Sequence, residues 1–134
     1  MNFNNNEKII NYLGLDWGEK RIGIATADSE TRLALPFMTV SSLKELLPIL
    51  KAEETDKIIL GEPVKMRGEA SNNPAWLNFY DNLKKESALE IILIDERMSS
   101  LGADSLGGDK KQRASRDEIS ASIILQNYLD KNFD

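Results

Sequence analysis

Cysteine and histidine are both missing from this 134-residue chain. Their absence excludes disulfide scaffolds, Cys/His zinc sites, thiol nucleophiles and any general base built on imidazole. Aromatic residues make up only 7% of the chain, so no extended platform for base stacking is evident. If the protein is an enzyme, carboxylates, lysines, hydroxyls or a hard metal held by oxygen ligands must carry its chemistry.

Long hydrophobic runs are also missing. No stretch approaches the ~18 apolar residues of a membrane span, and residues 1–8 lack the apolar core of a secretory signal. Seventeen basic and 22 acidic residues give a net charge of −5, so any contact with nucleic acid has to come from local basic patches. We therefore expect a cytoplasmic protein with no membrane partner.

The length is that of one domain, and 41% of the residues are hydrophobic. We expect residues 1–8 to be a disordered start and residues 9–134 to form a single domain. Three strands are predicted first, and Glu19-Lys20 joins the first two as a hairpin. These strands are Asn11–Gly18, Arg21–Asp28 and Leu33–Val40. Pro36 places the third strand at an edge or a bulge of the sheet.

Helices alternate with strands in the rest of the chain. Leucine spacing predicts a helix at Ser42–Glu54, which Pro48 is expected to kink or delay. A helix at Ala75–Ser87 would use Leu77, Tyr80 and Leu83 for its contacts. The last and clearest helix is Ser115–Lys131. Two strands, Lys57–Leu60 and Glu90–Glu96, are apolar at almost every position and are predicted to be central and parallel. The order predicts an α/β fold, with a mixed five-stranded sheet of three antiparallel and two parallel strands covered by helices.

Acidic residues mark the ends of several predicted elements. Asp16 interrupts an apolar strand, where an isolated carboxylate is costly to bury. Glu96 ends another strand beside Asp95, and only one of these two can point into a shared site because adjacent strand residues face opposite sides. Asp117 is placed at the start of the last helix, on one face with Ala121, Ile124 and Tyr128. Carboxylates that converge repel one another unless a cation lies between them, and an oxygen-only ligand set selects Mg²⁺ or Mn²⁺.

Each acid also has a purely structural interpretation. Ser115 and Glu118 match a capping box around Asp117, and the sequence Asp95-Glu96-Arg97 matches an ion-paired turn. Basic residues gather in loops, where they can contact phosphates or simply solvate a surface. These are Lys20, Arg21, Lys65, Arg67, Lys110, Lys111, Arg113 and Arg116.

Four motifs in order resemble the YqgF/RuvX family of Holliday junction resolvases, also described as pre-16S rRNA nucleases. The segment from Gly14-Leu15-Asp16-Trp17-Gly18 to Ala25 is similar to the opening motif of that family. Gly61-Glu62-Pro63 with Met66-Arg67-Gly68 resembles the second motif, and Asp95-Glu96-Arg97 the third. The helix from Asp117 to Asp130 resembles the closing motif. Together these motifs extend over nearly the whole chain.

The resemblance implies a ribonuclease H-like fold and a metal-dependent phosphodiesterase. The acidic triad of the family falls on Asp16, Glu96 and Asp117, which we expect to be catalytic and to bind two Mg²⁺ or Mn²⁺ ions. The basic residues named above, together with Arg97, are expected to bind nucleic acid. The expected function is hydrolysis of structured nucleic acid in 5′ end processing of pre-16S rRNA.

Three alternatives stay open. One is a Holliday junction resolvase acting on branched DNA, and a second is a non-catalytic nucleic-acid-binding module on the same fold. A more distant one is an ATP-binding relative, because the opening motif also resembles the phosphate-binding element of actin-like and Hsp70-like ATPases. The chain is expected to act as a monomer or a homodimer, and a resolvase would favour a symmetric dimer.

This chain departs from the family pattern at three points. Glu62 stands where an apolar residue is expected and is predicted to place an extra negative charge near the site. Arg67 replaces the usual Asp or Asn. The basic loop between Arg97 and Asp117 is shorter than usual. These departures bear on the choice of substrate more than on catalysis.

Overall fold

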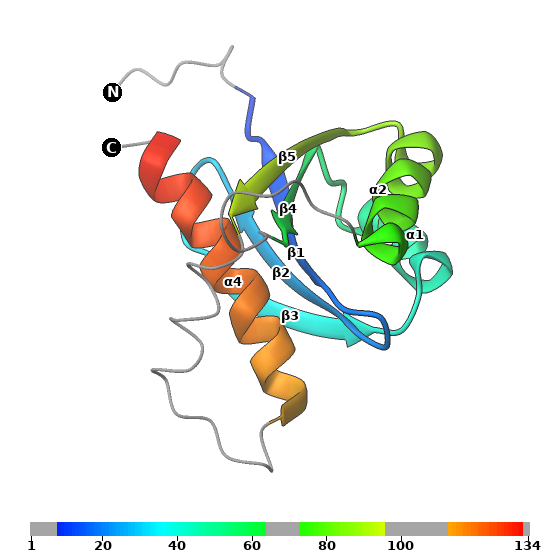
Figure 1. Cartoon of the computed structure of the whole chain (residues 1–134). Coiled ribbons are helices and arrows are strands. Elements are labelled where there is room, and N and C mark those ends of the chain that lie inside the picture. Colours follow the sequence, from blue (N-terminus) through cyan, green and yellow to red (C-terminus); the bar gives the residue numbers. More distant parts are fainter. Residues whose placement is uncertain (1–7, 64–72, 96–112, 133–134) are drawn as a thin grey trace, which may run out of the picture.

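A five-stranded mixed sheet runs through the computed structural model, which describes residues 8–63, 73–95 and 113–132 (Figure 1). The strand order across the sheet is β3-β2-β1-β4-β5. The strands are β1 (Asn11–Trp17), β2 (Ile22–Asp28), β3 (Leu35–Val40), β4 (Lys57–Glu62) and β5 (Glu90–Asp95). β1, β2 and β3 pair in antiparallel fashion, whereas β4 pairs in parallel with both β1 and β5. The predicted fold class and the predicted hairpin are confirmed.

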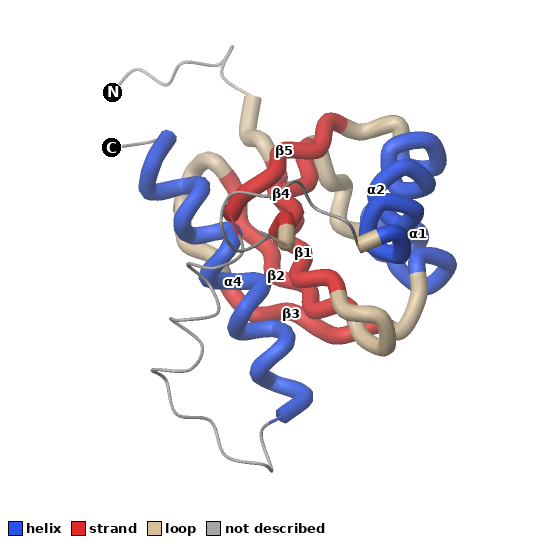
Figure 2. The backbone as a smooth tube through the Cα atoms, viewed as in Figure 1, coloured by secondary structure: helices blue, strands red, loops and turns tan. Residues whose placement is uncertain are grey.

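The helices divide between the two faces of this sheet. Figure 2 shows α4 (Arg113–Asn132) across one face, and α1 (Leu43–Ala52) and α2 (Pro74–Ser87) on the other. Each face has its own hydrophobic core, and both cores pack against the central strands β1 and β4. None of the described helices is long and apolar enough to cross a bilayer.

The alternation of side chains along β1 separates these two cores. Leu13 and Leu15 are fully buried on the α1/α2 side, whereas Tyr12 is buried on the α4 side. Gly14 lies on the α4 side as well, where a Cβ atom would come within 2.7 Å of the Leu125 Cβ. Because strand residues two apart share a face, Asp16 also faces α4.

The helix α1 begins after Ser42, whose hydroxyl accepts a hydrogen bond from the Glu45 backbone N–H. It continues through Pro48 to Ala52 without interruption. The expected late start is therefore wrong, because the serine cap fixes the beginning of the helix upstream of the proline.

The helix α2 is anchored by Trp76, which is 1% exposed and donates from its indole Nε1 to the Gly61 carbonyl at 3.3 Å. Leu83 is buried and Tyr80 packs against the same core, as predicted. The prediction for Leu77 is wrong, because its side chain is 42% exposed. The inner face of α2 follows the spacing of Trp76, Phe79 and Leu83, and position 77 lies outside it.

The outer strands of the sheet differ in how well the sequence predicted them. β3 is an edge strand with an irregular register at Ile24/Ala25, as Pro36 indicated. β5, predicted to be central, forms the opposite edge, and Ile91–Ile94 are only partly buried. A strand that is hydrophobic at every position is predicted to be covered on both faces. The pattern does not show whether the strand has a neighbouring strand on each side. β4 meets the prediction fully, with Ile58–Leu60 completely buried.

Candidate active site

Asp16 and Asp117 lie on the same face of the sheet, on either side of Gly23. Asp16 of β1 is paired directly with Gly23 of β2, so their Cβ directions point to the same face. A Cβ atom on Gly23 would overlap the backbone carbonyl of Asp117 and lie 3.0 Å from its Cβ. The missing side chain of Gly23 therefore lets α4 approach the sheet, so that Asp117 packs on the strand partner of Asp16.

Arg21 binds one of these two carboxylates. Its guanidinium Nε donates to Asp117 Oδ2 at 2.6 Å, an ion pair between residues 96 positions apart in the sequence. The Arg21 side chain is 49% exposed and that of Asp117 24%. Arg21 immediately precedes β2, and its own carbonyl accepts a hydrogen bond from the Gly18 N–H at 2.8 Å. The site thus contains a cation whose backbone is held by the hairpin turn.

A second contact fixes α4 on the next strand of the sheet. The Thr39 hydroxyl of β3 donates to Glu118 Oε2 at 3.1 Å, and Thr39 is paired with Gly23. Asp16, Gly23 and Thr39 therefore form a row across three strands beneath the segment that contains Asp117 and Glu118. Sequence reasoning did not identify Gly23 or Thr39 as parts of the site. A glycine inside an apolar strand is the signal that indicates close backbone approach, and it was available for Gly23.

The capping box proposed for Asp117 is wrong. α4 begins at Arg113, so Asp117 lies beyond the first turn, which contains no acidic residue. Glu118 contacts Thr39 of the sheet. In the described structure, Asp117 contacts Arg21 beside β2 and Glu118 contacts Thr39 of β3.

Strand alternation also shows on which face of the sheet the acidic residues at the ends of β4 and β5 lie. Leu60 belongs to the core on the α1/α2 side, so Glu62, two residues later, lies on that side and away from Asp16. The predicted extra charge of Glu62 at the site is therefore wrong. Ile94 packs on the α4 side, so Asp95 faces the other way, together with its strand partner Glu62. Glu96 itself lies outside the described residues.

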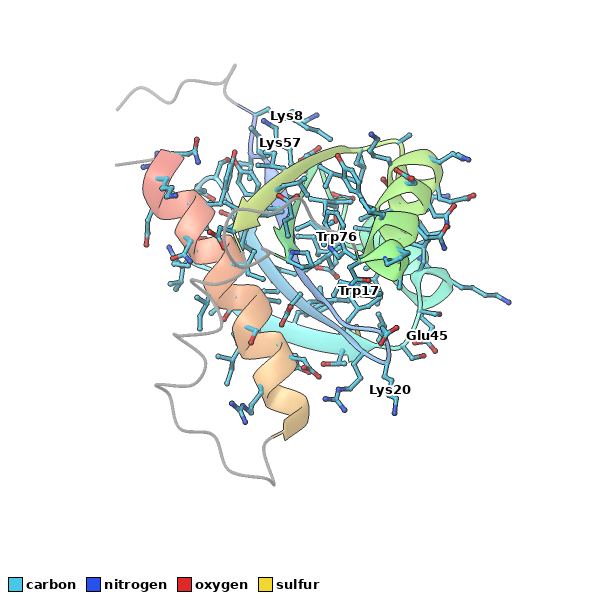
Figure 3. The ribbon with its side chains drawn as sticks, in the orientation of Figure 1. Lys8, Trp17, Lys20, Glu45, Lys57 and Trp76 are labelled. Atoms are coloured by element: carbon cyan, nitrogen blue, oxygen red, sulfur yellow. The ribbon has the colours of Figure 1, made fainter. Side chains whose placement is uncertain are left out.

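The predicted nucleic-acid-binding residues are only partly covered by the structure. Lys20 is exposed at the tip of the β1–β2 hairpin and extends away from the ribbon (Figure 3). Arg21 pairs with Asp117, and Arg116 is partly buried one position before it. The remaining predictions fall outside the described side chains: Lys65, Arg67, Arg97, Lys110, Lys111 and Arg113.

Asp16 and Asp117 are both partly exposed to solvent. Two hollows, of about 270 and 520 Å³, are present elsewhere. The first is lined by Asn11 and Asp28, at the opposite end of β1 and β2 from Asp16, and the second lies between the C-terminal ends of α1 and α2. A polymeric substrate does not need an enclosed cavity, so partly exposed carboxylates are compatible with chemistry on a nucleic acid backbone.

The donor atoms at this site suit a hard divalent cation. Asp16 and Asp117 offer carboxylate oxygens alone, the ligand type that Mg²⁺ and Mn²⁺ prefer. Within the described ranges no group of three acidic, histidine or cysteine side chains is close enough to bind a metal. The described residues supply two carboxylates of the predicted triad, those of Asp16 and Asp117.

A family profile described as "RuvX: Holliday junction resolvase" matches residues 10–131, almost the whole chain. The chain belongs to the RuvX family. Relatives named "Putative pre-16S rRNA nuclease" include one from Fusobacterium nucleatum, 36% identical over 89% of this chain and 96% of the relative. Another, from Desulfitobacterium hafniense, is 38% identical over 88% of this chain and 90% of the relative.

Solved structures confirm the ribonuclease H-like fold of this RuvX chain. The Thermus thermophilus RuvC structure in complex with a Holliday junction superimposes with a TM-score of 0.57 at 14% identity, and the match extends over 90% of this chain and 93% of RuvC. The fowlpox virus resolvase, bound to Holliday junction DNA, gives a TM-score of 0.54 at 16% identity and matches 93% of this chain and all of that chain. At these identities the likeness concerns the fold alone.

Proposed function

We propose that this protein is a metal-dependent nuclease that cleaves phosphodiester bonds in precursor 16S rRNA, in the processing of its 5′ end. The observation that carries the proposal is the arrangement of two acids around Gly23. Asp16 is the strand partner of Gly23, and Asp117 packs directly on it. Carboxylates that share a partly exposed site repel each other unless cations neutralise them. Arg21 supplies one such positive charge, at Asp117, in the described structure.

Glu96 is proposed as the third acidic residue. β5 points towards the site end of the sheet, and Asp95 faces the α1/α2 side. Strand alternation excludes Asp95 from the α4 face, so of the two adjacent acids only Glu96 fits the role. The proposed ligand set is therefore Asp16, Glu96 and Asp117, with no histidine needed.

When bound, one or two Mg²⁺ or Mn²⁺ ions would activate water and stabilise the charge that develops on the leaving oxygen. The residues of the chain then have three tasks. Asp16 and Asp117 provide the oxygen ligands, Gly23 keeps the two acids close together, and the exposed basic residues orient the phosphate backbone. Lys20 on the hairpin tip is the described cation best placed for this last task.

The choice of precursor 16S rRNA as substrate is supported by the names of the relatives, several of which match most of this chain. A second candidate, resolution of four-way DNA junctions, is favoured by the description of the matching family. These two functions differ in the expected assembly, because a four-way junction presents two symmetry-related cuts and calls for a symmetric dimer.

The test compares cleavage of three labelled substrates: a 16S precursor fragment, an unstructured RNA and a four-way DNA junction. Wild type, Asp16→Asn and the control Asp81→Asn are assayed with Mg²⁺, with Mn²⁺ and with EDTA. Asp81 is an exposed carboxylate of α2, on the other face of the sheet. We expect metal-dependent cleavage of the precursor, a loss of more than about a hundredfold in Asp16→Asn, and full activity in Asp81→Asn.

Each other result has a definite meaning. Preferred cleavage of the junction would establish the resolvase function in place of rRNA processing. Binding of nucleic acid without hydrolysis in any metal would identify a non-catalytic module. Cleavage that persists in EDTA or in Asp16→Asn would refute the metal site.

A further inference from the structure

The ion pair between Arg21 and Asp117 places a cation on a carboxylate that is proposed to bind metal. The described contact uses only the guanidinium Nε, at 2.6 Å from Asp117 Oδ2. The two terminal nitrogens of Arg21 make no hydrogen bond to any described residue, and half of the side chain is exposed. Arginine carries five N–H donors in a fixed fork, so the described residues leave four of them unused for a phosphate.

We propose that Arg21 is a positioning residue that holds Asp117 until a divalent cation takes its place, and that the released guanidinium then binds a phosphate of the substrate. This inference rests on the proposed function, because it requires Asp117 to be a metal ligand. It couples metal binding to substrate binding through one side chain. The order is metal first, then nucleic acid.

The energetics of the pair favour such an exchange. Partly exposed ion pairs are weak, and in water they lower the free energy of the protein by little. A divalent cation carries twice the charge of the guanidinium and gains ligands from Asp16 as well as Asp117. Competition with Arg21 should therefore reduce metal affinity by only about two- to fivefold, which a metal at ordinary concentration overcomes.

The local backbone allows the side chain to move without rearranging the fold. The Arg21 carbonyl is held by the Gly18 N–H, and β2 begins at the next residue. Only the Arg21 side chain has to swing for Asp117 to become available. Lys20, its neighbour in the turn, is exposed and forms no ion pair with a described residue. Lys20 thus provides a control with the same charge and almost the same position.

The first experiment measures RNA binding without metal or cleavage. Fluorescence anisotropy of a labelled 16S precursor fragment in EDTA compares wild type, Asp117→Ala, and the double variant Arg21→Gln/Asp117→Ala. Alanine retains the Cβ that packs on Gly23.

Asp117→Ala frees Arg21 and should bind the RNA about two- to fivefold more tightly than wild type. The double variant has the net charge of wild type and should bind like wild type. Asp81→Asn, which removes a negative charge without freeing a cation, should change binding less than Asp117→Ala.

The second experiment measures Mn²⁺ affinity by calorimetry in the absence of RNA. Arg21→Gln removes the competing cation and should bind Mn²⁺ about two- to fivefold more tightly than Lys20→Gln, which removes the same charge from the same turn. Arg21→Lys keeps a competing charge and should remain close to wild type. Circular dichroism of each variant verifies the fold before binding is measured.

Two results would overturn the inference. If the double variant binds RNA more weakly than wild type in EDTA, Arg21 already contacts phosphate in the metal-free protein. If Arg21→Gln and Lys20→Gln bind Mn²⁺ equally well, Arg21 does not compete for Asp117. In either case, the proposed function would still be supported if wild type shows metal-dependent cleavage and Asp16→Asn does not. Conversely, the expected binding results without cleavage in any metal would support the exchange and reject the nuclease.

Discussion

Gly23 of β2 lies against the backbone of Asp117 in α4, with no room between them for a Cβ atom. The same glycine is the direct strand partner of Asp16. One residue without a side chain therefore sets the separation of two acidic residues that are about a hundred positions apart in the sequence. The site depends on how closely α4 packs on the sheet, as well as on the acids themselves.

Gly23→Ala is expected to separate α4 from the sheet at Asp117. Overpacking of this kind usually costs about 1–3 kcal/mol of unfolding free energy, which urea denaturation measures. The matched control is Gly14→Ala, whose Cβ would crowd Leu125 farther along α4. Both variants should lose stability, but Gly23→Ala should lose more Mn²⁺ affinity and more cleavage. Equal losses of function at equal stability would contradict a specific role for Gly23.

Thr39→Val tests the attachment of α4 to the edge strand β3. The substitution preserves shape and removes the hydroxyl that donates to Glu118 Oε2. We expect a loss of about 0.5–1.5 kcal/mol in unfolding free energy. A double-mutant cycle with Glu118→Ala should give a coupling energy of similar size. Strictly additive effects of the two substitutions would show that this hydrogen bond contributes nothing to stability.

The sequence predicted the elements of this fold better than their environment. Periodicity located five strands and the described helices, since each depends on which side chains are apolar along a short segment. It missed the edge position of β5, because the number of neighbouring strands is a property of the assembled sheet. It also missed the ion pair of Arg21 with Asp117, which arises only when α4 crosses β2. The orientation of Asp95 away from the α4 face needed the observed alternation of β5.

Trp76→Phe is expected to loosen the end of β4 that lies beside the site strand β1. The indole Nε1 donates to the Gly61 carbonyl, and the ring stacks on Tyr80 with centroids 5.3 Å apart. Losing the hydrogen bond and some volume should reduce the unfolding free energy by about 1–3 kcal/mol. Tyr80→Phe keeps its ring and serves as the control. Since Trp17 then remains the sole tryptophan, its fluorescence reports unfolding directly. An unchanged urea midpoint would contradict the anchoring role of Trp76.

Asp28 gives the protein an acid-sensitive contribution to stability in the turn between β2 and β3. Backbone N–H groups of Thr31 and Glu30, together with the Thr31 hydroxyl, donate to Asp28 Oδ1. The hydrogen bond from the Thr31 backbone is the largest of the effects that hold the pKa of Asp28 below its usual value.

A carboxyl whose pKa is lower in the folded than in the unfolded state stabilises the fold above the unfolded value, near 4. This contribution is lost as the pH falls from that value through the lower folded pKa. Asp28→Asn should therefore be less stable than wild type at pH 7, and the difference in urea midpoint should shrink as the pH is lowered to about 2–3. Asp81→Asn, which alters an exposed carboxylate of α2 away from this turn, is the matched control. A constant difference between Asp28→Asn and wild type over the whole range would show that the charge of Asp28 does not stabilise this turn.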